Sequence, residues 1–503
     1  MKVTRKNTFN LREEVSGKRD YFCYLFLLTL FVISLLGGEK MFGLLGIILS
    51  LCLLIYLAYR GWSVILIAPI LALLATSFAL FDGGEVHLLA TYTETFMTNA
   101  GNYVKNYYPV FLLGALFGKV MDDTGTANSI AMFIAKKVGK GKEIWAIVIA
   151  GGLITYGGVS MFVAAFALYP IGAALFREAN IPKRLLPGAI AMGTFTFSMT
   201  GLPGSPQIQN AIPMKYLGTD LFAAPVLGIV ASLIMFFGGT LWIVTRAAKA
   251  RKAGEGYGIH PNENLNIVDV SDAPSFGSAM IPILIVLVGN FVLSKVIFPG
   301  INFSYLEETY KTTTAAVLGN WSLIISLVVA ILVAVSLNVK RFKRGIMATL
   351  KDGVRGSFLA IMNTASEVGY GNVIKTLAAF GIVGGALMGI SSNPLITTAI
   401  SSSVLAGITG SASGGVSIAL ETFGQTFMNQ AMAKGIDIQV LHRVAAVACG
   451  GLDSLPHNGA VITLLGITGM THKESYVHIG MVTVVIPLLA TIVVVTLGSF
   501  GIV

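Results

Sequence analysis

The stretch CGGLDSLPHNG, residues 449–459, places polar side chains where the surrounding chain is apolar. Asp453, Ser454, His457 and Asn458 fall within six residues, and glycines flank them on both sides. A carboxylate and an imidazole can exchange a proton, and hydroxyl and amide groups can bind a polar solute. Ionisable groups inside a membrane are rare and often functional. The stretch predicts a binding site in which Asp453 and His457 form a proton-carrying pair.

The composition of the whole chain indicates a membrane protein. Of its 503 residues, 55% are hydrophobic and 12% are charged, whereas soluble domains carry roughly 25% charge. Apolar runs recur from residue 21 to the C-terminus, and about 20 such residues span a bilayer. A β-barrel would show short alternating segments instead. We therefore expect an all-α polytopic membrane protein, whose net charge of +10 reflects basic cytoplasmic loops and not nucleic-acid binding.

Basic residues also predict the organisation of the chain. The first twenty residues carry six Lys or Arg, and the apolar run 21–37 follows without a small-residue cleavage site. We expect residues 1–40 to form a cytoplasmic N-terminus and an extra transmembrane helix. A polar stretch behind a basic cluster predicts a cytoplasmic linker at residues 247–276. The linker separates two predicted repeats, residues 41–246 and residues 277–503.

Two apolar regions do not fit simple spans. Residues 144–176 have basic clusters on both sides, as a re-entrant hairpin would, and their middle reads TYGGVS. Residues 391–432 contain SASGGVS, with GGVS 257 residues after the first (414 − 157). GLPGSP at 201–206 resembles SLPHNG at 454–459, which lies 253 residues later (454 − 201). Two matches in the same order predict a duplication, and the threading of loops predicts that its copies have inverted topology.

Each predicted repeat supplies a hairpin tip and an interrupted helix. Irregular backbone at membrane depth must be buried in protein or line a wet cavity. The N-terminal ends of half-helices suit a carboxylate, and glycines let a ligand approach the backbone. The alternative is that Gly and Ser only allow close helix packing. The predicted substrate-binding residues are Gly157, Gly158, Ser160, Thr200, Gly201, Gly204, Ser205, Ser413, Gly414, Gly415, Ser417, Ser454, His457 and Asn458.

Glu367 joins Asp453 and His457 as a candidate for proton coupling. It stands in NTASEVGYG, a segment with the same Gly and Ser character as the predicted breaks. Structural pairing near a membrane face is the alternative role for such groups, above all for Asp122 and Asp123. The three cysteines lie apart in apolar runs, so neither a metal site nor a cofactor is expected.

Longer motifs resemble a known family. YGGVSMFVAAFALYPIGAALFREANIPKRLLPGAIAMG, FTFSMTGLPGSPQIQNAIP and SLPHNGAVITLL are similar to the gluconate-permease (GntP-type) family of the ion-transporter superfamily, from about residue 41 onward. The resemblance implies a secondary symporter for small organic acids in the cytoplasmic (inner) membrane of a bacterium. It also implies two inverted repeats, each with a re-entrant hairpin and an interrupted helix, and commonly a homodimer.

The resemblance bears on the substrate and the coupling ion as well. Members similar to this chain take gluconate and related sugar acids, D-serine or 3-hydroxybutyrate, and FREANIPKRLLPG is most similar to the hydroxybutyrate group. Sodium-coupled relatives often carry Ser-Asn-Thr at the hairpin tips, where this chain has Gly-Gly-Val-Ser. We therefore expect proton coupling, with sodium coupling as the alternative.

Two other functional classes fit less well. An intramembrane hydrolase would use Asp453, Ser454 and His457, but the base and orienting group of a triad normally come from separate elements. No Gly-x-Ser-x-Gly elbow surrounds Ser454. An anion channel would need an open pore, which hairpins closing a site from both sides disfavour. The sequence thus predicts a carrier and not an enzyme.

The charge distribution predicts the sides on which two positions lie. Single cysteines introduced at Lys249 and at Val503, in a background without the native cysteines, should react with a membrane-impermeant maleimide from opposite sides. Lys249 belongs to a basic cluster and is expected in the cytoplasm, whereas the last span carries Val503 outside. Labelling of both cysteines from one side would contradict the threading.

Overall fold

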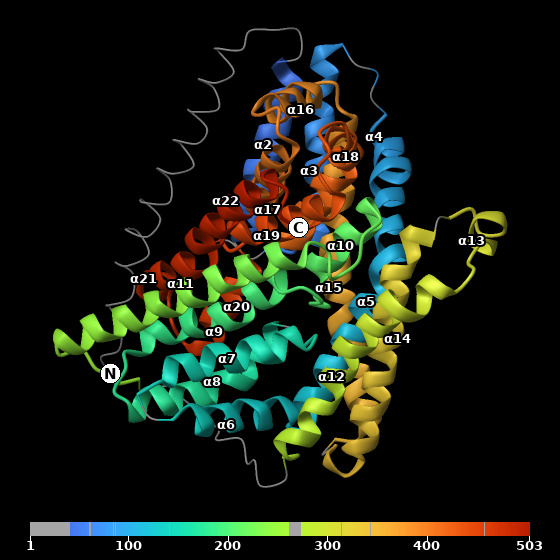
Figure 1. Ribbon diagram of the computed structural model, residues 1–503. Helices are drawn as coiled ribbons and strands as arrows, with labels where there is room; N and C mark the ends of the chain where they lie inside the picture. Colours follow the sequence, from blue (N-terminus) through green and yellow to red (C-terminus); the bar gives the residue numbers. More distant parts are fainter. Residues whose placement is uncertain are drawn as a thin grey trace, which may run out of the picture. The chain divides into compact units, whose positions relative to one another are not determined.

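The structure is a computed structural model that describes residues 41–503 except residues 60–61, 84, 86, 140, 160, 261–272, 313, 343 and 457. In this part of the chain all regular elements are helices, as predicted (Figure 1). The predicted first helix, residues 21–37, lies outside the described residues. The α-helices are α2 (Met41–Tyr59), α3 (Val64–Ala79), α4 (Leu88–Ala90), α5 (Thr98–Asp123), α6 (Thr126–Val138), α7 (Glu143–Tyr156), α8 (Met161–Glu178), α9 (Leu186–Thr194), α10 (Ile208–Leu217), α11 (Pro225–Lys252), α12 (Phe276–Val292), α13 (Tyr305–Glu308), α14 (Thr314–Leu337), α15 (Ile346–Thr376), α16 (Phe380–Gly389), α17 (Pro394–Thr409), α18 (Ala412–Ala433), α19 (Ile438–Leu452), α20 (Gly459–Thr468), α21 (His472–Gly480) and α22 (Ile486–Ser499).

Short 3-10 and π-helical turns extend or connect these helices. They are η1 (Leu80–Asp82), η2 (Thr91–Met97), η3 (Lys183–Leu185), η4 (Phe197–Gly201), η5 (Leu293–Ile297), η6 (Phe298–Gly300), η7 (Val339–Arg341) and η8 (Met481–Val485). The π-helical η8 joins α21 to α22, so that His472–Ser499 forms one long apolar helix.

The chain divides into two compact units, residues 1–99 with 369–386 and residues 100–368 with 387–503. In the first unit α2 packs on α3. The Asp82 carboxylate accepts hydrogen bonds from the N–H groups of Phe42 and Gly43 at 3.0 and 2.6 Å, which satisfies donors at the start of α2. Both units take segments from both halves of the chain, so they differ from the predicted repeats, whose boundaries remain a prediction.

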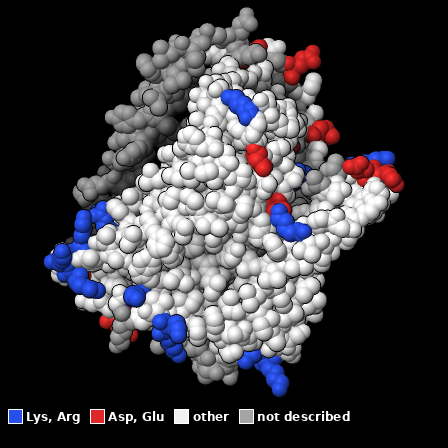
Figure 2. Space-filling view, in the orientation of Figure 1, with Lys and Arg blue, Asp and Glu red and all other residues white. Residues whose placement is uncertain are grey.

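Several helices of the described residues are suited to a membrane. Five of them are long and apolar enough to cross it. On α11 the side chains Val226, Ile229, Leu233, Phe237 and Leu241 recur every three or four residues and are between 47% and 50% exposed. Such a row of exposed apolar groups fits contact with hydrocarbon. Most of the surface seen in Figure 2 likewise carries neither basic nor acidic side chains.

The second unit contains one succession of elements twice (Figure 1). The helical hairpin α7–α8 is followed by the interrupted helix α9–η4–α10 and by α11, which has 28 residues. The hairpin α17–α18 is followed by the interrupted helix α19–α20 and by the segment His472–Ser499, which also has 28 residues. The helices α7, α19 and α20 are apolar but too short to span a bilayer alone.

The helix boundaries give the register between the two successions. α10 and α20 have 10 residues each and begin 251 residues apart (459 − 208). Both end at a glycine in the left-handed region, Gly218 with φ 64° and Gly469 with φ 63°. Glycine adopts this conformation without a steric penalty and is therefore the common residue at a helix C-terminus.

The two successions interlock through their interrupted helices. α10 packs on α18 and α19, whereas α20 packs on α8 and α9. The second half of each interrupted helix therefore lies against a hairpin arm and an interrupted helix of the other succession. This exchange brings both breaks into one region of the second unit.

The beginning of the predicted linker is ordered. The Arg184 guanidinium binds both oxygens of Glu255, with Nε–Oε1 and Nη2–Oε2 distances of 2.6 and 2.8 Å. These bonds hold the pKa of Glu255 below its ordinary value. Tyr257 donates its N–H to Asn180 Oδ1 at 3.0 Å. Residues 253–257 are thus attached to the loop before α9, and residues 261–272 lie outside the described part.

Candidate substrate site

The first break lies between η4 and α10. Gly204 turns the chain with φ 79°, and a Cβ at this position would lie 2.5 Å from the ring of Phe222, so only glycine fits. Ser205 is buried and donates to an η4 carbonyl oxygen at 2.6 Å. Thr200 and Gly201 end η4, and their carbonyl groups have no following helical turn to bind them.

A buried guanidinium satisfies the carbonyl groups around this break. Arg443, on α19, is 0% exposed. Its Nη1 donates to the carbonyl oxygens of Thr200 and Gly201 at 3.4 and 3.2 Å. Its Nη2 reaches the carbonyl oxygens of Leu221 and Ala223 at 3.3 and 2.7 Å. An arginine of the second interrupted helix thus replaces the missing backbone donors of the first.

The side chain of Asn210 extends this network. Its Oδ1 accepts from Arg443 Nη1 at 3.0 Å, which identifies that atom as the oxygen. His442 Nε2 lies 3.1 Å from the same oxygen and therefore carries the proton, while His442 Nδ1 accepts from the Thr219 hydroxyl at 2.6 Å. Asn210 Nδ2 donates to the carbonyl of Ser205 at 2.9 Å. All of these groups bind α10 and the first break to α19.

The second break begins after α19, which ends one residue before Asp453. Asp453 therefore lies beyond the end of the helix, and its predicted pairing with His457 stays a prediction. His457 itself lies outside the described residues. Ser454 is buried and donates to Asp453 Oδ1 at 3.0 Å. Asn458 is the N-cap of α20, where its Oδ1 accepts two backbone N–H groups at 2.7 and 2.9 Å.

The two hairpins turn at positions that do not correspond in the alignment of the two GGVS motifs. The first hairpin turns at Gly157 and Gly158, and Gly158 has φ 95°. The second turns at Gly410 and Ser411, so Ser413, Gly414, Gly415 and Ser417 lie in the first turns of α18 and not at the turn itself. The two GGVS motifs are therefore not equivalent in space. A Cβ on Gly415 would overlap the backbone of Ala406 on α17, which gives this glycine a packing role. Ser160 lies outside the described residues.

Matching side-chain amides join each break to the adjacent hairpin. Gln207, at the N-cap position of α10, donates Nε2 to the carbonyl oxygens of Thr155 and Val159 at 2.6 and 3.2 Å. Asn458, at the N-cap of α20, donates Nδ2 to the carbonyl oxygen of Gly410 at 2.7 Å. The two amides are 251 residues apart (458 − 207), the register of α10 and α20. We call these contacts the first and second amide bridges.

The first hairpin has further ties to its break. The Tyr156 hydroxyl donates to the carbonyl of Pro203 at 2.7 Å, and Thr155 Oγ1 donates to Ser198 Oγ at 2.7 Å. The bond between the second tip and its break comes from Asn458 among the described contacts. Among the described side chains, the first hairpin tip thus has more hydrogen bonds to its break than the second tip has.

Glu367 lies beside the second hairpin. It belongs to α15 and is 5% exposed. A Cβ added to Gly414 would overlap Glu367 Oε2. Among the described residues, neither Glu367 Oε2 nor the hydroxyl oxygen of the buried Ser417 has a hydrogen-bond partner. The structure thus brings the predicted residues Gly414 and Glu367 together.

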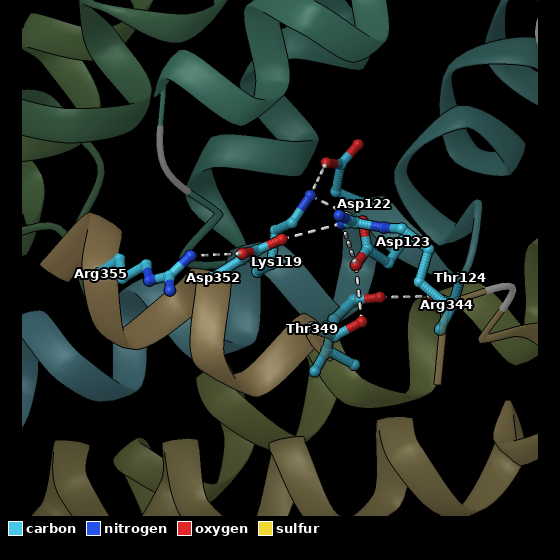
Figure 3. Close-up of polar contacts among 9 residues, drawn as sticks. Lys119, Asp122, Asp123, Thr124, Arg344, Thr349, Asp352 and Arg355 are labelled. Atoms are coloured by element: carbon cyan, nitrogen blue, oxygen red, sulfur yellow. Dashed lines mark hydrogen bonds and ion pairs between the residues drawn. The ribbon is translucent and has the colours of Figure 1, made fainter. Parts of the chain in front are cut away.

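Asp122 and Asp123 form structural ion pairs (Figure 3). Lys119 Nζ lies 3.0 Å from Asp122 Oδ2 and 2.7 Å from Asp123 Oδ1. Arg344 Nη2 and Thr349 Oγ1 both reach Asp123 Oδ2, at 3.3 and 2.6 Å. The cluster fastens the end of α5 to the beginning of α15. The carboxylates of Asp122 and Asp123 therefore have a structural role.

The most important contacts in this region come from residues that the sequence analysis missed. Arg443 stands in the apolar run LHRVAAVACGGL, and a charged residue at such a place signals a buried role. Gln207 directly follows GLPGSP, but the sequence does not indicate which groups its amide binds.

The two interrupted helices approach each other closely where they cross. A Cβ on Gly450 would lie 2.9 Å from Thr200 Cγ2, so the crossing leaves little space for a side chain at this position.

Two solved structures of transporters have a fold similar to that of this all-helical chain. The Alcanivorax borkumensis YdaH transporter matches with a TM-score of 0.53 at 16% identity, over 82% of this chain and 89% of that one. MtrF of Neisseria gonorrhoeae, described as one of a class of antimetabolite efflux pumps, matches with a TM-score of 0.50 at 13% identity, over 87% of this chain and 94% of that one. At these identities the likeness shows the fold alone.

The sequence profile of the GntP family permeases matches residues 42–500, so the chain belongs to the GntP permease family. The uncharacterized transporter YxjC of Bacillus subtilis is 41% identical over 453 residues, which cover 87% of this chain and 95% of that protein. The gluconate permease of Bacillus subtilis is 31% identical over 196 residues, 36% of this chain and 41% of that protein. The family and these relatives are permeases and transporters, not enzymes.

Replacing the amide donors should loosen the hairpins without removing the helix cap. Asn458→Asp keeps an oxygen for the α20 N–H groups but leaves the Gly410 carbonyl without its donor, and Gln207→Glu does the same to Thr155 and Val159. A buried acceptor left unpaired costs roughly 1–3 kcal/mol. Hydrogen exchange of the detergent-solubilised protein should accelerate at residues 155–159 for Gln207→Glu and at residues 409–412 for Asn458→Asp. Unchanged exchange rates at both tips would show that the amide bridges do not stabilise the hairpins. The control is Gln425→Glu, at an exposed position.

Arg443→Lys should destabilise the protein despite keeping the charge. An ammonium offers three donors from one point and cannot reach all the carbonyl groups that the guanidinium binds. We expect a loss of about 3 kcal/mol or more, because at least two buried carbonyl groups lose their partners. Thermal unfolding monitored by tryptophan fluorescence in detergent measures the effect, with the exposed Arg355→Lys as control. A melting temperature equal to that of the parent would contradict this role.

Proposed function

We propose that this permease is a secondary active symporter that takes up small hydroxycarboxylates together with protons by alternating access. Gluconate-like sugar acids and 3-hydroxybutyrate are the proposed substrates, and the cytoplasmic (inner) membrane is the proposed location. The observation that carries the proposal is the reciprocal packing of two interrupted helices with two hairpins. In the proposed architecture each chain contains two inverted repeats with re-entrant hairpins, and two chains form a homodimer.

The chemistry of the breaks supports a carboxylate substrate. α10 begins at the first break without a side-chain cap, and the N–H groups at such a helix start attract an anion. At the starts of α18 and α20, Ser411 and Asn458 already accept some of these N–H groups. Glycines at both breaks let a ligand approach the backbone. The hydroxyls predicted to bind the substrate, including Ser160 and Ser454, would recognise its hydroxyl groups. The amide of Asn458, also predicted to bind it, is used by α20 and Gly410. The similarity to the gluconate permease over 196 residues supports the sugar-acid class.

Proton coupling has two candidate carboxyl groups among the described residues, Asp453 and Glu367. Asp453 lies at the second break, where Ser454 donates to it. Glu367 lies at the second hairpin and is more deeply buried. His457 is a third candidate from the sequence. Sodium coupling is the alternative, and it would leave uptake indifferent to pH.

Uptake into proteoliposomes tests the proposal. A labelled monocarboxylate such as gluconate or 3-hydroxybutyrate should accumulate when the outside is made acidic in sodium-free buffer. One monoanion carried with one proton is electroneutral, so a gradient of one pH unit supports up to about tenfold accumulation. Accumulation that requires a sodium gradient and ignores the pH gradient would establish the alternative. Exchange of internal for external substrate, one for one, would separate a carrier from a channel.

A further inference from the structure

The second hairpin and two helices beside it contribute buried oxygen atoms to one cluster. Among the described residues, Glu367 Oε2, Ser417 Oγ and the Tyr103 hydroxyl have no hydrogen-bond partner. Tyr103, from α5, lies beside Ser417 and interacts electrostatically with Glu367. Three separate helices, α5, α15 and α18, thus bring one carboxyl group and two hydroxyl groups together. We call these residues the Glu367 cluster.

A proton on Glu367 would remove the unfavourable buried charge of the cluster. A buried polar atom without a partner costs roughly 1–3 kcal/mol, and an isolated buried carboxylate costs considerably more. The described polar groups that act on Glu367 are the Ser411 and Tyr103 hydroxyls, and neither is a cation. A proton on the carboxyl group removes the buried charge and adds one donor for the neighbouring oxygens.

The cluster touches the part of the hairpin that begins α18. Gly414 lies against Glu367 Oε2 with no room for a side chain, and its N–H donates to Ser411 Oγ at 3.2 Å. The N-terminal end of this 22-residue helix favours a negative charge nearby, whereas burial favours the neutral acid. These opposing influences keep both protonation states of Glu367 within reach.

We propose that Glu367 carries the coupled proton, and that its protonation allows the tip of the second hairpin to close against α15. This inference rests on the proposed symport. Loss of the proton leaves a carboxylate that requires water, and water enters as the tip of α18 separates from α15. Movement of the tip would break the second amide bridge, the described hydrogen bond between the tip and the break. Asp453 accepts a hydrogen bond from Ser454 and is less buried than Glu367. Its role in this proposal is to stabilise the conformation of the second break.

Glu367→Gln tests the proposal because glutamine has the shape of the protonated acid and never ionises. The variant should exchange internal for external substrate within about twofold of the parent rate, since exchange does not need proton release. Accumulation driven by a pH gradient of one unit, worth up to about tenfold in the parent, should be lost. Its substrate affinity should no longer change with pH, whereas that of the parent should weaken as the pH rises and Glu367 ionises.

The neighbouring hydroxyls and an exposed glutamate provide the controls. Tyr103→Phe and Ser417→Ala keep the carboxyl group but remove donors to its anion, so the midpoint of the pH-dependent affinity should move to higher pH. Glu308→Gln, on the exposed helix α13, should behave like the parent. Infrared difference spectra of the parent protein should show a protonated-carboxyl band that disappears at high pH and returns with substrate, even if a variant does not fold.

The outcomes separate the inference from the proposed function. A Glu367→Gln protein that still accumulates substrate on a pH gradient, or that keeps the parent pH dependence of affinity, would overturn the inference alone. So would the lack of a substrate-dependent carboxyl band in the parent. A parent protein that ignores the pH gradient would overturn the proposed proton symport itself.

Discussion

Backbone hydrogen bonding in an apolar environment is the constraint on which the second unit depends. Each interrupted helix leaves carbonyl and N–H groups without a partner in the helix, and such groups need another partner when they are buried. At the first break the guanidinium of Arg443 binds the carbonyl groups of Thr200 and Gly201, and at the second Asn458 caps α20. Because Arg443 belongs to α19, the first break is complete only when the second interrupted helix lies beside it. The interlocking of the two successions is therefore a requirement of the breaks themselves.

The two hairpins differ in the number of described side-chain hydrogen bonds that join their tips to the breaks. Gln207, Tyr156 and Thr155 tie the first hairpin to its break, whereas Asn458 provides the described tie at the second tip. A tip with fewer bonds opens at a lower free-energy cost. The unpaired oxygens of the Glu367 cluster lie at that same tip. The proposed moving tip and the proposed proton carrier thus lie at the same hairpin.

The coarse architecture could be predicted from composition and motifs, but the contacts of the site could not. Hydropathy indicated an all-helical membrane protein, and the Gly- and Pro-rich stretches marked both interrupted helices. The GGVS match failed as an alignment of the hairpin tips because a short glycine motif serves a turn at Gly157 and helix packing at Gly415. The roles of Arg443 and Gln207 depend on neighbours that are distant in sequence, such as Thr200 and Val159, and no periodicity reveals such pairs.

The reciprocal packing of α10 and α20 also affects how the chain is made. During synthesis α10 emerges about two hundred residues before α18 and α19, the helices against which it packs. Until those helices are inserted, the carbonyl groups of the first break have neither a helical turn nor Arg443 to bind them. A nascent chain that ends in the linker is thus left with an unfinished membrane segment. The first succession can therefore reach its final packing only after α18 and α19 are made. Until then, the linker must leave the surface of α10 accessible to these helices.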